Sequence, residues 1–587
     1  MTAEPLDTPD TAEVPDALES LRHWRLRPGV SASALTHGLH LRGWSTSVTL
    51  EGSPALPALW RMVEEALRTG GAGDLSARTA AGTPLRAALC TLIGQLHAHG
   101  MLVEDPAPPE DAPARDWLLT VAARPAGAAA ALAAARVVVR AADPDGALAA
   151  AVVRALARAG LTAHRAEAVG GAGAGGRVLL RATRADGTER AVGAAVHPDG
   201  AFVTPVGSRA RAEADTAALA ERLGLDKAPA PAADPAPALT ALVAGGAVQR
   251  LLCAVAGLPD PGSEGTGGGP DAPPRFPSVL VAGERPPRSA YHPWPVGSPE
   301  PVAPPGTLAE ALAAVAALGD ERLGVLAAPL TGILPQLPVA LAGCAAPGGG
   351  GPLMAGAARA DLARLDALCR AAELRCGAGR SGVVVGAGPG HALGRALRRA
   401  ALRLPLPGTG AAPWDAYGSG HPQARHWWGV LTRRLGVRAE LSVAPLDADG
   451  TAYRADVRGR AAGRLLGQAV EATAGDAAAY AALAALVRVQ AGELDPTVRH
   501  ITSPGGELCP LTAAGVVPAP WEDERWAVGW WAGVAGREAD LHAVLHGLTG
   551  LRTRPWEPDG PEARAVLAAL RGCGFTVLDT DTEGGPR

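Results

Sequence analysis

The sequence predicts a multidomain protein that combines α/β and α+β folds. At 587 residues the chain is too long for one ordinary hydrophobic core. Segments rich in Pro, Gly and Asp divide it, and they lie at Asp105–Pro113, Lys227–Pro235, Gly257–Arg275 and His292–Pro305. We therefore expect a winged-helix-like α+β module at 1–105, a doubly wound α/β domain at 114–297 and an α+β domain at 298–587.

The N-terminal module reads as a small sheet followed by helices. We expect strands at Trp24–Val30, Gly38–Arg42 and Thr46–Leu50, helices at Pro54–Thr69 and Pro84–His99, and a closing segment at Met101–Glu104. Strands this short leave backbone edges available to a partner peptide. The pattern therefore favours a module that holds a peptide over one that reacts with it.

The middle domain begins with a strand–turn–helix–strand order. The predicted elements are a strand at Arg136–Arg140, a turn at Asp143–Gly146, a helix at Ala147–Gly160, and strands at Leu161–Ala166 and Arg177–Arg181. This order predicts a parallel sheet. A dinucleotide site at the first turn needs about three glycines, whereas this turn has one glycine and two carboxylates. We expect no nucleotide here.

The C-terminal domain alternates Ala/Leu-rich helices with short strands. Helices are expected at 307–318, 357–375, 389–403, 462–492 and 560–573, and strands at Leu323–Leu326, Gly382–Val385, Arg438–Val443 and Ala452–Val457. This mixture predicts an α+β domain.

Composition and charge exclude several classes of protein. The net charge of −4 gives no reason to expect a nucleic-acid partner. The N-terminus lacks the pattern of a signal peptide, and no long uninterrupted apolar stretch predicts a membrane span. The seven cysteines are scattered and form no CxxC pair, which argues against structural zinc and for reduced thiols in the cytoplasm.

A second glycine-rich segment is a candidate nucleotide loop. An apolar strand precedes Gly386-x-Gly388-x-Gly390, and a helix is expected after it. No acidic residue stands about 20 positions further on, where a ribose-binding carboxylate belongs. We interpret the segment as a helix-entry turn; a nucleotide-dependent oxidoreductase that uses Gly386–Gly394 stays an alternative.

The helix expected at 357–375 carries three carboxylates. Asp366 and Glu373 are seven residues apart, so they share a face. Arg370 lies between them and would neutralise them. We interpret Asp361, Asp366 and Glu373 as parts of a solvated, salt-bridged helix face and expect no metal site and no catalytic residue here.

Tryptophan pairs stand out in a chain with only 3% aromatic residues. They could be core anchors or interface residues. We expect Trp427 and Trp428 in the core, and one ring of the pair Trp530 and Trp531 to be more exposed.

Segments along the chain resemble a known assembly. Leu26–Val30, Gly38–Arg42 and Ser47–Gly52 are similar to the PqqD-like recognition element, while Asp199–Gly207 and Tyr291–Pro295 are similar to parts of ThiF-like domains. The domain order resembles ocin-ThiF-like proteins, which bind precursor leader peptides as partners of azoline-forming YcaO cyclodehydratases in the biosynthesis of thiopeptides and related azole-containing peptides.

The C-terminal part resembles a YcaO domain that has lost its metal ligands. Leu365–Glu373 and the helix containing Ala485–Gln490 are similar to YcaO helices. Arg370 stands where the family has a metal-binding Glu, and Ala485 or Arg488 stands where another is expected. Because Mg²⁺ binds oxygen ligands, the resemblance implies a degenerate ThiF-like domain and a degenerate YcaO-like domain with no cofactor and no metal.

These inferences predict a leader-peptide-binding subunit that is not catalytic alone. A leader would add as a strand to the segment Thr46, Ser47, Val48, Thr49 and Leu50, with its apolar side chains against helix residues Leu85, Leu89, Leu92 and Ile93. Arg42 and Arg86 would meet acidic leader residues or be ordinary surface residues.

The expected partners are the precursor peptide, a separate YcaO enzyme and, as one option, a second copy of the chain. Two alternatives to a peptide-binding subunit stay open. The N-terminal module could be an ordinary winged helix, and the whole chain could be a self-sufficient ATP-dependent cyclodehydratase. Binding of DNA is disfavoured because Arg86 is the only permanent cation of the second helix.

Overall fold

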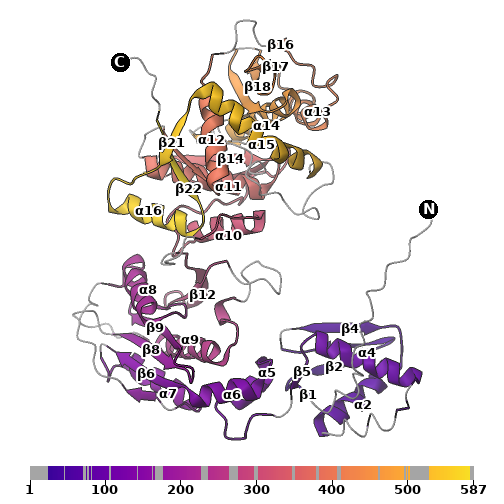
Figure 1. The fold of residues 1–587 in the computed structure, drawn as a ribbon, viewed down its shortest axis with the longest axis vertical. Helices are drawn as coiled ribbons and strands as arrows, with labels where there is room; N and C mark the ends of the chain where they lie inside the picture. The colour runs from indigo at the N-terminus through magenta and orange to yellow at the C-terminus, as the bar shows by residue number, and fades with distance from the viewer. Residues whose placement is uncertain are drawn as a thin grey trace. The chain divides into compact units, whose positions relative to one another are not determined.

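The computed structural model divides into two compact units, Met1–Glu264 with Leu280–Ala290 and Gly265–Val279 with Tyr291–Arg587 (Figure 1). The structure describes residues 24–44, 46–69, 75, 79–80, 82–104, 107–141, 143–161, 163–165, 176–226, 236–263, 275–295, 302–346, 351–377, 382–405, 412–460, 463–494, 498, 500–502 and 528–581. It is a mixed α/β chain with several separate sheets.

The N-terminal module has the predicted order of strands followed by helices. Its elements are β1 (Trp24–Leu26), β2 (Ser31–Leu35), β3 (Gly38–Arg42), β4 (Ser47–Glu51), α2 (Leu56–Thr69), α4 (Pro84–Ala98) and β5 (Leu102–Glu104). One sheet has the order β2-β3-β4, and β1 pairs separately with β5. The strand β2 was not predicted, because its segment Ser-Ala-Ser-Ala-Leu has no large apolar residue before Leu35 and all of its side chains are exposed.

The helix α4 begins where its capping residues dictate. Thr83 accepts a hydrogen bond from the Arg86 N–H at 3.3 Å, and Pro84 occupies the first helical position. Its apolar face joins residues of β3 and α2 in one core, which includes Leu39, Leu41, Trp60, Leu89 and Leu96. The module therefore has its own hydrophobic core.

Arg27 ties this module to the first helix of the middle domain. Its guanidinium donates to the carbonyls of Leu119, Thr120 and Ala122 at the end of α5 (Arg115–Val121) and to that of Gly100. The last carbonyls of a helix have no N–H partner within the helix. The arginine supplies those donors from the neighbouring module.

A seven-stranded sheet forms the middle domain. After α5 come α6 (Pro125–Ala134), β6 (Arg136–Ala141), α7 (Ala147–Arg158), β7 (Ala163–Arg165), β8 (Arg177–Thr183), β9 (Glu189–His197), β10 (Gly200–Val203), α8 (Arg209–Arg222), α9 (Pro237–Ala256), β11 (Ser278–Gly283) and β12 (Arg288–Pro293). The strand order is β12-β11-β10-β9-β8-β6-β7.

The expected parallel, doubly wound sheet is wrong for most of this domain. The strands β6 and β7 pair in parallel, whereas β6–β8, β8–β9, β9–β10 and β10–β11 pair antiparallel. Only a few residues separate β8 from β9 and β9 from β10, and such short connections form hairpins, not crossovers. The prediction of a parallel sheet was based on the first strand–helix–strand unit alone, which is the part whose strands do pair in parallel.

Helices cover both faces of the sheet. The helix α9 packs against β8, β9 and β10. On the other face α8 approaches so closely that a Cβ on Gly193 would lie 2.0 Å from the Thr216 hydroxyl. The 20 residues of α9 are long and apolar enough to cross a membrane, but most of the helix is buried within the protein. It serves here as the central core helix.

The C-terminal unit contains three small sheets with helices between them. Its elements are α10 (Leu308–Leu318), β13 (Ala340–Ala345), β14 (Pro352–Ala357), α11 (Ala360–Gly377), β15 (Val383–Gly386), α12 (Pro389–Ala401), β16 (Ala412–Pro413), α13 (Pro422–Gly429), β17 (Ala439–Pro445), β18 (Tyr453–Gly459), β19 (Leu465–Glu471), α14 (Ala474–Leu494), β20 (His500–Thr502), α15 (Val528–Thr549), β21 (Arg552–Pro555), α16 (Pro561–Gly572) and β22 (Thr576–Asp581). The sheet orders are β13-β14-β20, β15-β22-β21 and β16-β17-β18-β19.

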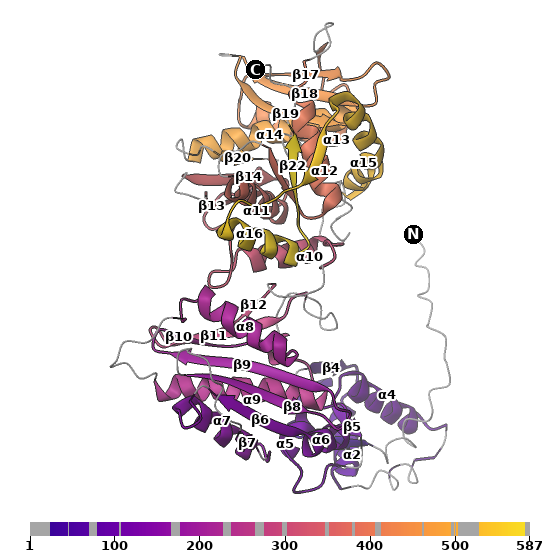
Figure 2. The same ribbon diagram turned by 60° about the vertical axis from the view of Figure 1, so that its left-hand side comes forward.

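Two predicted elements of this unit are wrong. Leu323–Leu326 is not a strand, and the helix expected at 462–492 is the strand β19 followed by α14. The Thr473 hydroxyl caps the helix by accepting the Asp476 N–H at 3.1 Å, so the helix begins only at Ala474. Figure 2 shows α14 against strands β17 to β19.

Candidate functional site

The outer edge of β4 is the candidate peptide-binding edge. Within the part of the chain that the structure describes, β4 pairs with β3 alone, in antiparallel register with Leu41 opposite Val48 and Leu39 opposite Leu50. Figures 1 and 2 both place α4 beside this strand. The predicted open edge is therefore present in the described sheet.

The register decides which backbone groups face outward. Hydrogen bonds from Gly43 N–H to the Thr46 carbonyl (2.8 Å) and from Gly52 N–H to the His37 carbonyl (2.9 Å) mark bonded pairs at the two ends of the β3–β4 ladder. Bonded and non-bonded pairs alternate along an antiparallel ladder. The N–H and C=O groups of Ser47, Thr49 and Glu51 therefore point to the open edge.

The side chains of β4 alternate between two environments. Val48 and Leu50 are half-buried and pack against the module core. Ser47 and Thr49 are exposed, and the Thr49 hydroxyl lies 2.9 Å from His40 Nδ1. An added strand would thus find two partly accessible apolar side chains on one face and polar ones on the other.

The start of β4 is anchored to the end of α4. Thr46 lies just before the strand, and its hydroxyl donates to the His99 carbonyl at 2.6 Å. Arg42, at the end of β3, is exposed and stands opposite Ser47. Arg42 is thus accessible to an acidic peptide residue, while Thr46 has a structural contact in the chain itself.

The predicted contribution of α4 needs correction. Leu89, Leu92 and Ile93 are buried in the module core, whereas Leu85 is 41% exposed. The apolar face that sequence reasoning assigned to a peptide is the face that the module uses for its own folding. Of these four side chains, only Leu85 is accessible to a ligand; half-buried Cys90, which the sequence did not single out, lies on the same helix.

Arg86 also has a partner within the chain. Its guanidinium Nη1 donates to the Thr79 carbonyl at 2.9 Å, and the side chain is partly buried. An acidic peptide residue would have to compete with that contact. Arg42 is therefore the better placed of the two predicted cations.

The carboxylates of α11 lie in the interior and not on a solvated face, contrary to the expectation for Asp366 and Glu373. Glu373 is bound by Arg395 (2.7 Å), Arg399 (2.9 Å) and Arg370 (3.1 Å). Burial disfavours its charge, but the three guanidinium groups outweigh burial and lower the pKa of Glu373 to about 2. The predicted pairing of Arg370 is confirmed for Glu373 but not for Asp366, and Asp361 pairs with Arg359.

The pKa of Asp366 shifts in the opposite direction to that of Glu373. Burial raises its pKa to about 7, which Arg395 opposes and the neighbouring Glu373 reinforces. Because the folded pKa lies above the unfolded value of 3.8, the contribution of this group to stability is complete below pH 4 and is lost as the pH rises through 7.

We predict that Asp366→Asn removes this pH dependence. Between pH 4 and pH 8 the parent should lose several kcal/mol of unfolding free energy as Asp366 ionises, at about 1.4 kcal/mol per pKa unit. The variant does not lose this contribution, so its unfolding free energy should rise relative to that of the parent over the same range. Urea unfolding of both proteins at a series of pH values measures this difference. Parallel curves for parent and variant would contradict it.

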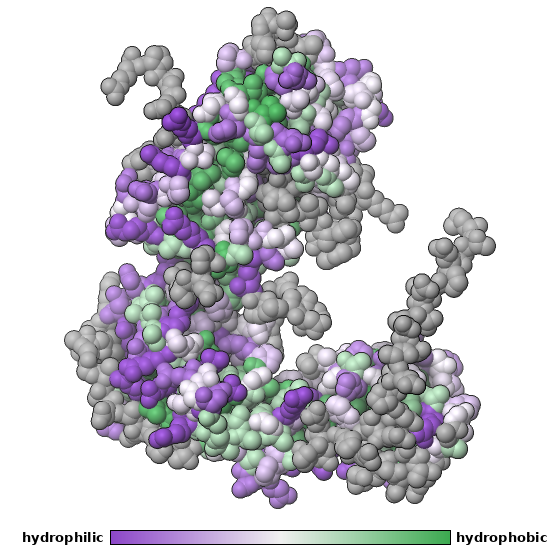
Figure 3. Space-filling view, in the orientation of Figure 1, coloured by the Kyte–Doolittle hydropathy of each residue, from purple (hydrophilic) through white to green (hydrophobic). Residues whose placement is uncertain are grey.

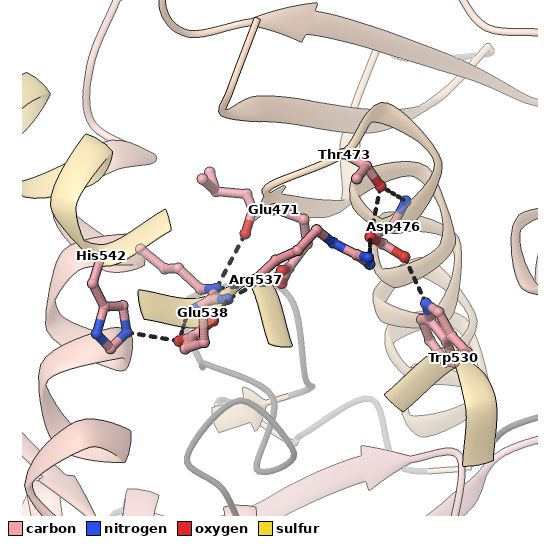
Figure 4. Close-up of polar contacts among 9 residues, drawn as sticks. Glu471, Thr473, Asp476, Trp530, Arg537, Glu538 and His542 are labelled. Carbon is pink, nitrogen blue, oxygen red and sulfur yellow. Dashed lines mark hydrogen bonds and ion pairs between the residues drawn. The ribbon is translucent and has the colours of Figure 1, made fainter. Parts of the chain in front are cut away.

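A second buried cluster centres on Arg398. Its guanidinium binds both oxygens of Glu538 at 2.7 Å and both oxygens of Glu471 at 3.0 and 3.2 Å. Glu538 also lies 2.7 Å from His542 Nε2 (Figure 4). One arginine thus binds two carboxylates, from β19 and α15. Burial nevertheless raises the pKa of Glu471 to about 7, because Arg398 offsets only part of the cost of its charge and Glu538 lies close by.

Asp476 is the centre of the neighbouring network (Figure 4). It accepts hydrogen bonds from Trp530 Nε1 (2.7 Å), Arg537 (2.6 Å) and the Thr473 hydroxyl (2.6 Å), and His421 lies 3.2 Å away. Burial opposes its charge, but these donors lower the pKa of Asp476 to about 2. Trp530 is more exposed than Trp531, as expected. Trp427 is in the core as expected, whereas Trp428 is only half-buried against it.

Arginines take the carboxylate oxygens that a divalent cation would need. Among the described residues, no group of three or more His, Cys, Asp and Glu side chains could hold a metal ion. Arg395, Arg398 and Arg399 all lie on α12 and serve both clusters. Arg398, Glu538 and Asp476 were not singled out from the sequence. Arg398 lies 73 and 140 positions from its two carboxylates, and Arg537 lies 61 positions from Asp476, so no local pattern joins them.

In the glycine-rich turn before α12, contacts within the chain take the space and one of the backbone donors that a phosphate would need. A Cβ on Gly386 would lie 2.4 Å from the Ala392 nitrogen, so this glycine permits the close approach of strand and helix. The Ala387 N–H donates to His391 Nδ1 at 3.0 Å, and Pro389 has no N–H. Two of the donors that would hold a phosphate are thereby removed, which favours the interpretation as a helix-entry turn.

No protein-family model matches the sequence, and no curated protein matches it. Among solved structures, it is similar to a heterocyclase in complex with substrate and cofactor, with 12% identity, a TM-score of 0.43, and coverage of 95% of this chain and 94% of that one. It is also similar to the heterocyclase TruD, with 12% identity, a TM-score of 0.35 and the same coverage. Both TM-scores lie below 0.5.

Proposed function

We propose that the chain is a cytoplasmic subunit that captures the leader of a ribosomal precursor peptide for a separate YcaO cyclodehydratase, which forms azoline rings. The observation that carries the proposal is the open edge of β4, where the backbone groups of Ser47, Thr49 and Glu51 point outward. Strand addition at such an edge supplies affinity through main-chain hydrogen bonds, and the side-chain pockets supply register. Val48 and Leu50 would contact the apolar residues of the leader.

The buried arginines support a role without independent catalysis. A YcaO-type reaction with ATP needs carboxylates free to hold Mg²⁺. In the described part of the C-terminal unit, Glu373, Glu471 and Glu538 are instead bound by guanidinium groups. Both the resemblance of the N-terminal module to a leader-binding element and these arginine–carboxylate contacts favour a delivery role over independent catalysis.

Direct binding tests the proposal. Fluorescently labelled synthetic leaders from a panel of azole-forming precursor peptides are titrated with the full chain, and fluorescence anisotropy is recorded. We expect saturable binding of one leader class that an unlabelled leader displaces and a core peptide does not. If no leader of the panel binds, the central proposal fails.

ATP turnover separates this function from the self-sufficient alternative. The purified chain alone, with Mg²⁺ and a precursor peptide, should consume no ATP above a buffer control. Addition of the YcaO enzyme should start turnover. Sustained ATP consumption by the chain alone would establish the cyclodehydratase alternative instead.

A further inference from the structure

A groove on the middle domain lies between α5, α7 and α9. It has a volume of about 650 Å³ and opens to solvent. Its floor consists of small and medium apolar residues: Ala151, Ala155, Gly245 and Val248. Trp117 of α5 lines one side, and Figure 3 shows apolar surface over α5 and α6 at this end of the domain. The strand-binding edge of β4 does not contribute to it.

The charged side chains that line this groove have one sign. Arg154 and Arg158 of α7 line it, are exposed and lie one turn apart on the same face. Neither makes an ion pair with a residue that the structure describes. The sequences of α7 and α9 contain no Asp or Glu, although the whole chain has a net charge of −4. The third helix, α5, has one carboxylate, Asp116, which pairs with the neighbouring Arg115 at 3.3 Å and does not line the groove. The groove is therefore complementary to an acidic ligand.

We propose that this groove binds an amphipathic helix of a partner polypeptide, with a narrow apolar face and an acidic flank. Small residues on the floor let a helix approach closely, and apolar anchors of such a helix would enter beside Trp117. Carboxylates four residues apart on the partner helix match the spacing of Arg154 and Arg158. The site is distinct from the leader edge and does not depend on it.

The concave shape favours a helix over a lipid surface. A bilayer would contact the exposed edges of the groove but would leave the floor at Ala151 and Gly245 unfilled. A single helix fills a groove of this kind with side chains spaced three and four residues apart.

A designed peptide tests the proposal on the full chain. The probe is a fluorescein-labelled peptide of roughly 20 residues, with Leu and Ala on one face and Glu at successive i, i+4 positions on its flank. The matched control peptide has Lys in place of every Glu. We expect saturable binding of the acidic peptide and none of the basic one.

Two variants locate the binding. Arg154→Glu combined with Arg158→Glu should weaken binding roughly tenfold or more, because the charges now repel. Gly245→Phe should fill the groove and abolish binding. A Cβ on Gly245 meets no atom within 4 Å, and removal of a helical glycine does not lower helix propensity, so the fold should be retained. Thermal melting checks that point.

Matched controls complete the design. Gly127→Phe places the same side chain on α6, where a Cβ also meets no atom within 4 Å, and Arg564→Glu reverses a charge on α16. Both should bind like the parent. Equal binding of acidic and basic peptides, or full binding by Gly245→Phe, overturns the proposal. Co-sedimentation with phosphatidylglycerol vesicles that depends on Arg154 and Arg158, without peptide binding, also overturns it in favour of a membrane surface.

Discussion

Replacement of Arg398 with methionine is expected to destabilise the C-terminal unit by about 3 to 5 kcal/mol. The guanidinium is fully buried and binds Glu471 and Glu538, each through both oxygens. Without it, two buried carboxylates face each other with no cation between them. Urea unfolding of the full chain, followed by intrinsic tryptophan fluorescence, measures the loss.

A surface ion pair provides the control for this prediction. Arg554 pairs with Asp579, and its side chain is 64% exposed, so Arg554→Met should cost at most about 1 kcal/mol. Arg398→Lys should fall between the two, because a lysine cannot make four hydrogen bonds in one plane. If Arg398→Met costs no more than Arg554→Met, the cluster is not a stabilising centre.

The whole cluster can also be replaced. A variant with Arg398→Met, Glu471→Leu and Glu538→Leu has no buried charge left unpaired, and apolar replacement of a complete buried ion cluster is often neutral or stabilising. We expect it to recover most of the stability that Arg398→Met loses. No recovery would show that the geometry of the network, beyond its charge balance, is required.

The second large effect concerns the peptide edge. Thr49→Pro should weaken leader binding by tenfold or more, which corresponds to roughly 1.4 kcal/mol or greater. The Thr49 N–H points away from β3, so its loss leaves the β3–β4 ladder intact while it removes an outward donor. The proline ring also occupies space that an added strand needs. Anisotropy titration of a labelled leader measures the change.

Thr49→Val is the matched control for the proline variant. Both substitutions remove the contact between the Thr49 hydroxyl and His40, but only proline removes the backbone donor. The valine variant should bind the leader within about twofold of the parent, since β-branched residues suit strands. Equal weakening by valine and proline would assign the effect to the side chain and would count against strand addition.

Local sequence patterns predicted much of the N-terminal module. Alternating apolar residues located β3 and β4, and Thr83-Pro84 set the start of α4. The candidate edge was predicted because its determinants are local. The roles of Leu89, Leu92 and Ile93 were not, because an apolar helix face looks the same in a sequence whether it packs on its own core or awaits a ligand.

Tertiary structure decided what contacts are made over long distances. Helical periodicity placed Asp366 and Glu373 on one face, but only the packed fold brings Arg395 and Arg399 of α12 against Glu373. In the middle domain, the first strand–helix–strand unit suggested a parallel sheet, and the hairpins after it made most of the sheet antiparallel.

The sequence by itself therefore determined the strands β3 and β4, the helices α2 and α4 and the mixed α/β class, because short-range propensity and periodicity encode them. Only the tertiary structure decided that arginines bind Glu373, Glu471 and Glu538 and that a groove lined by Arg154 and Arg158 lies between α5, α7 and α9. Charge pairing and concavity arise between segments far apart in the chain, and no local pattern records which segments will meet.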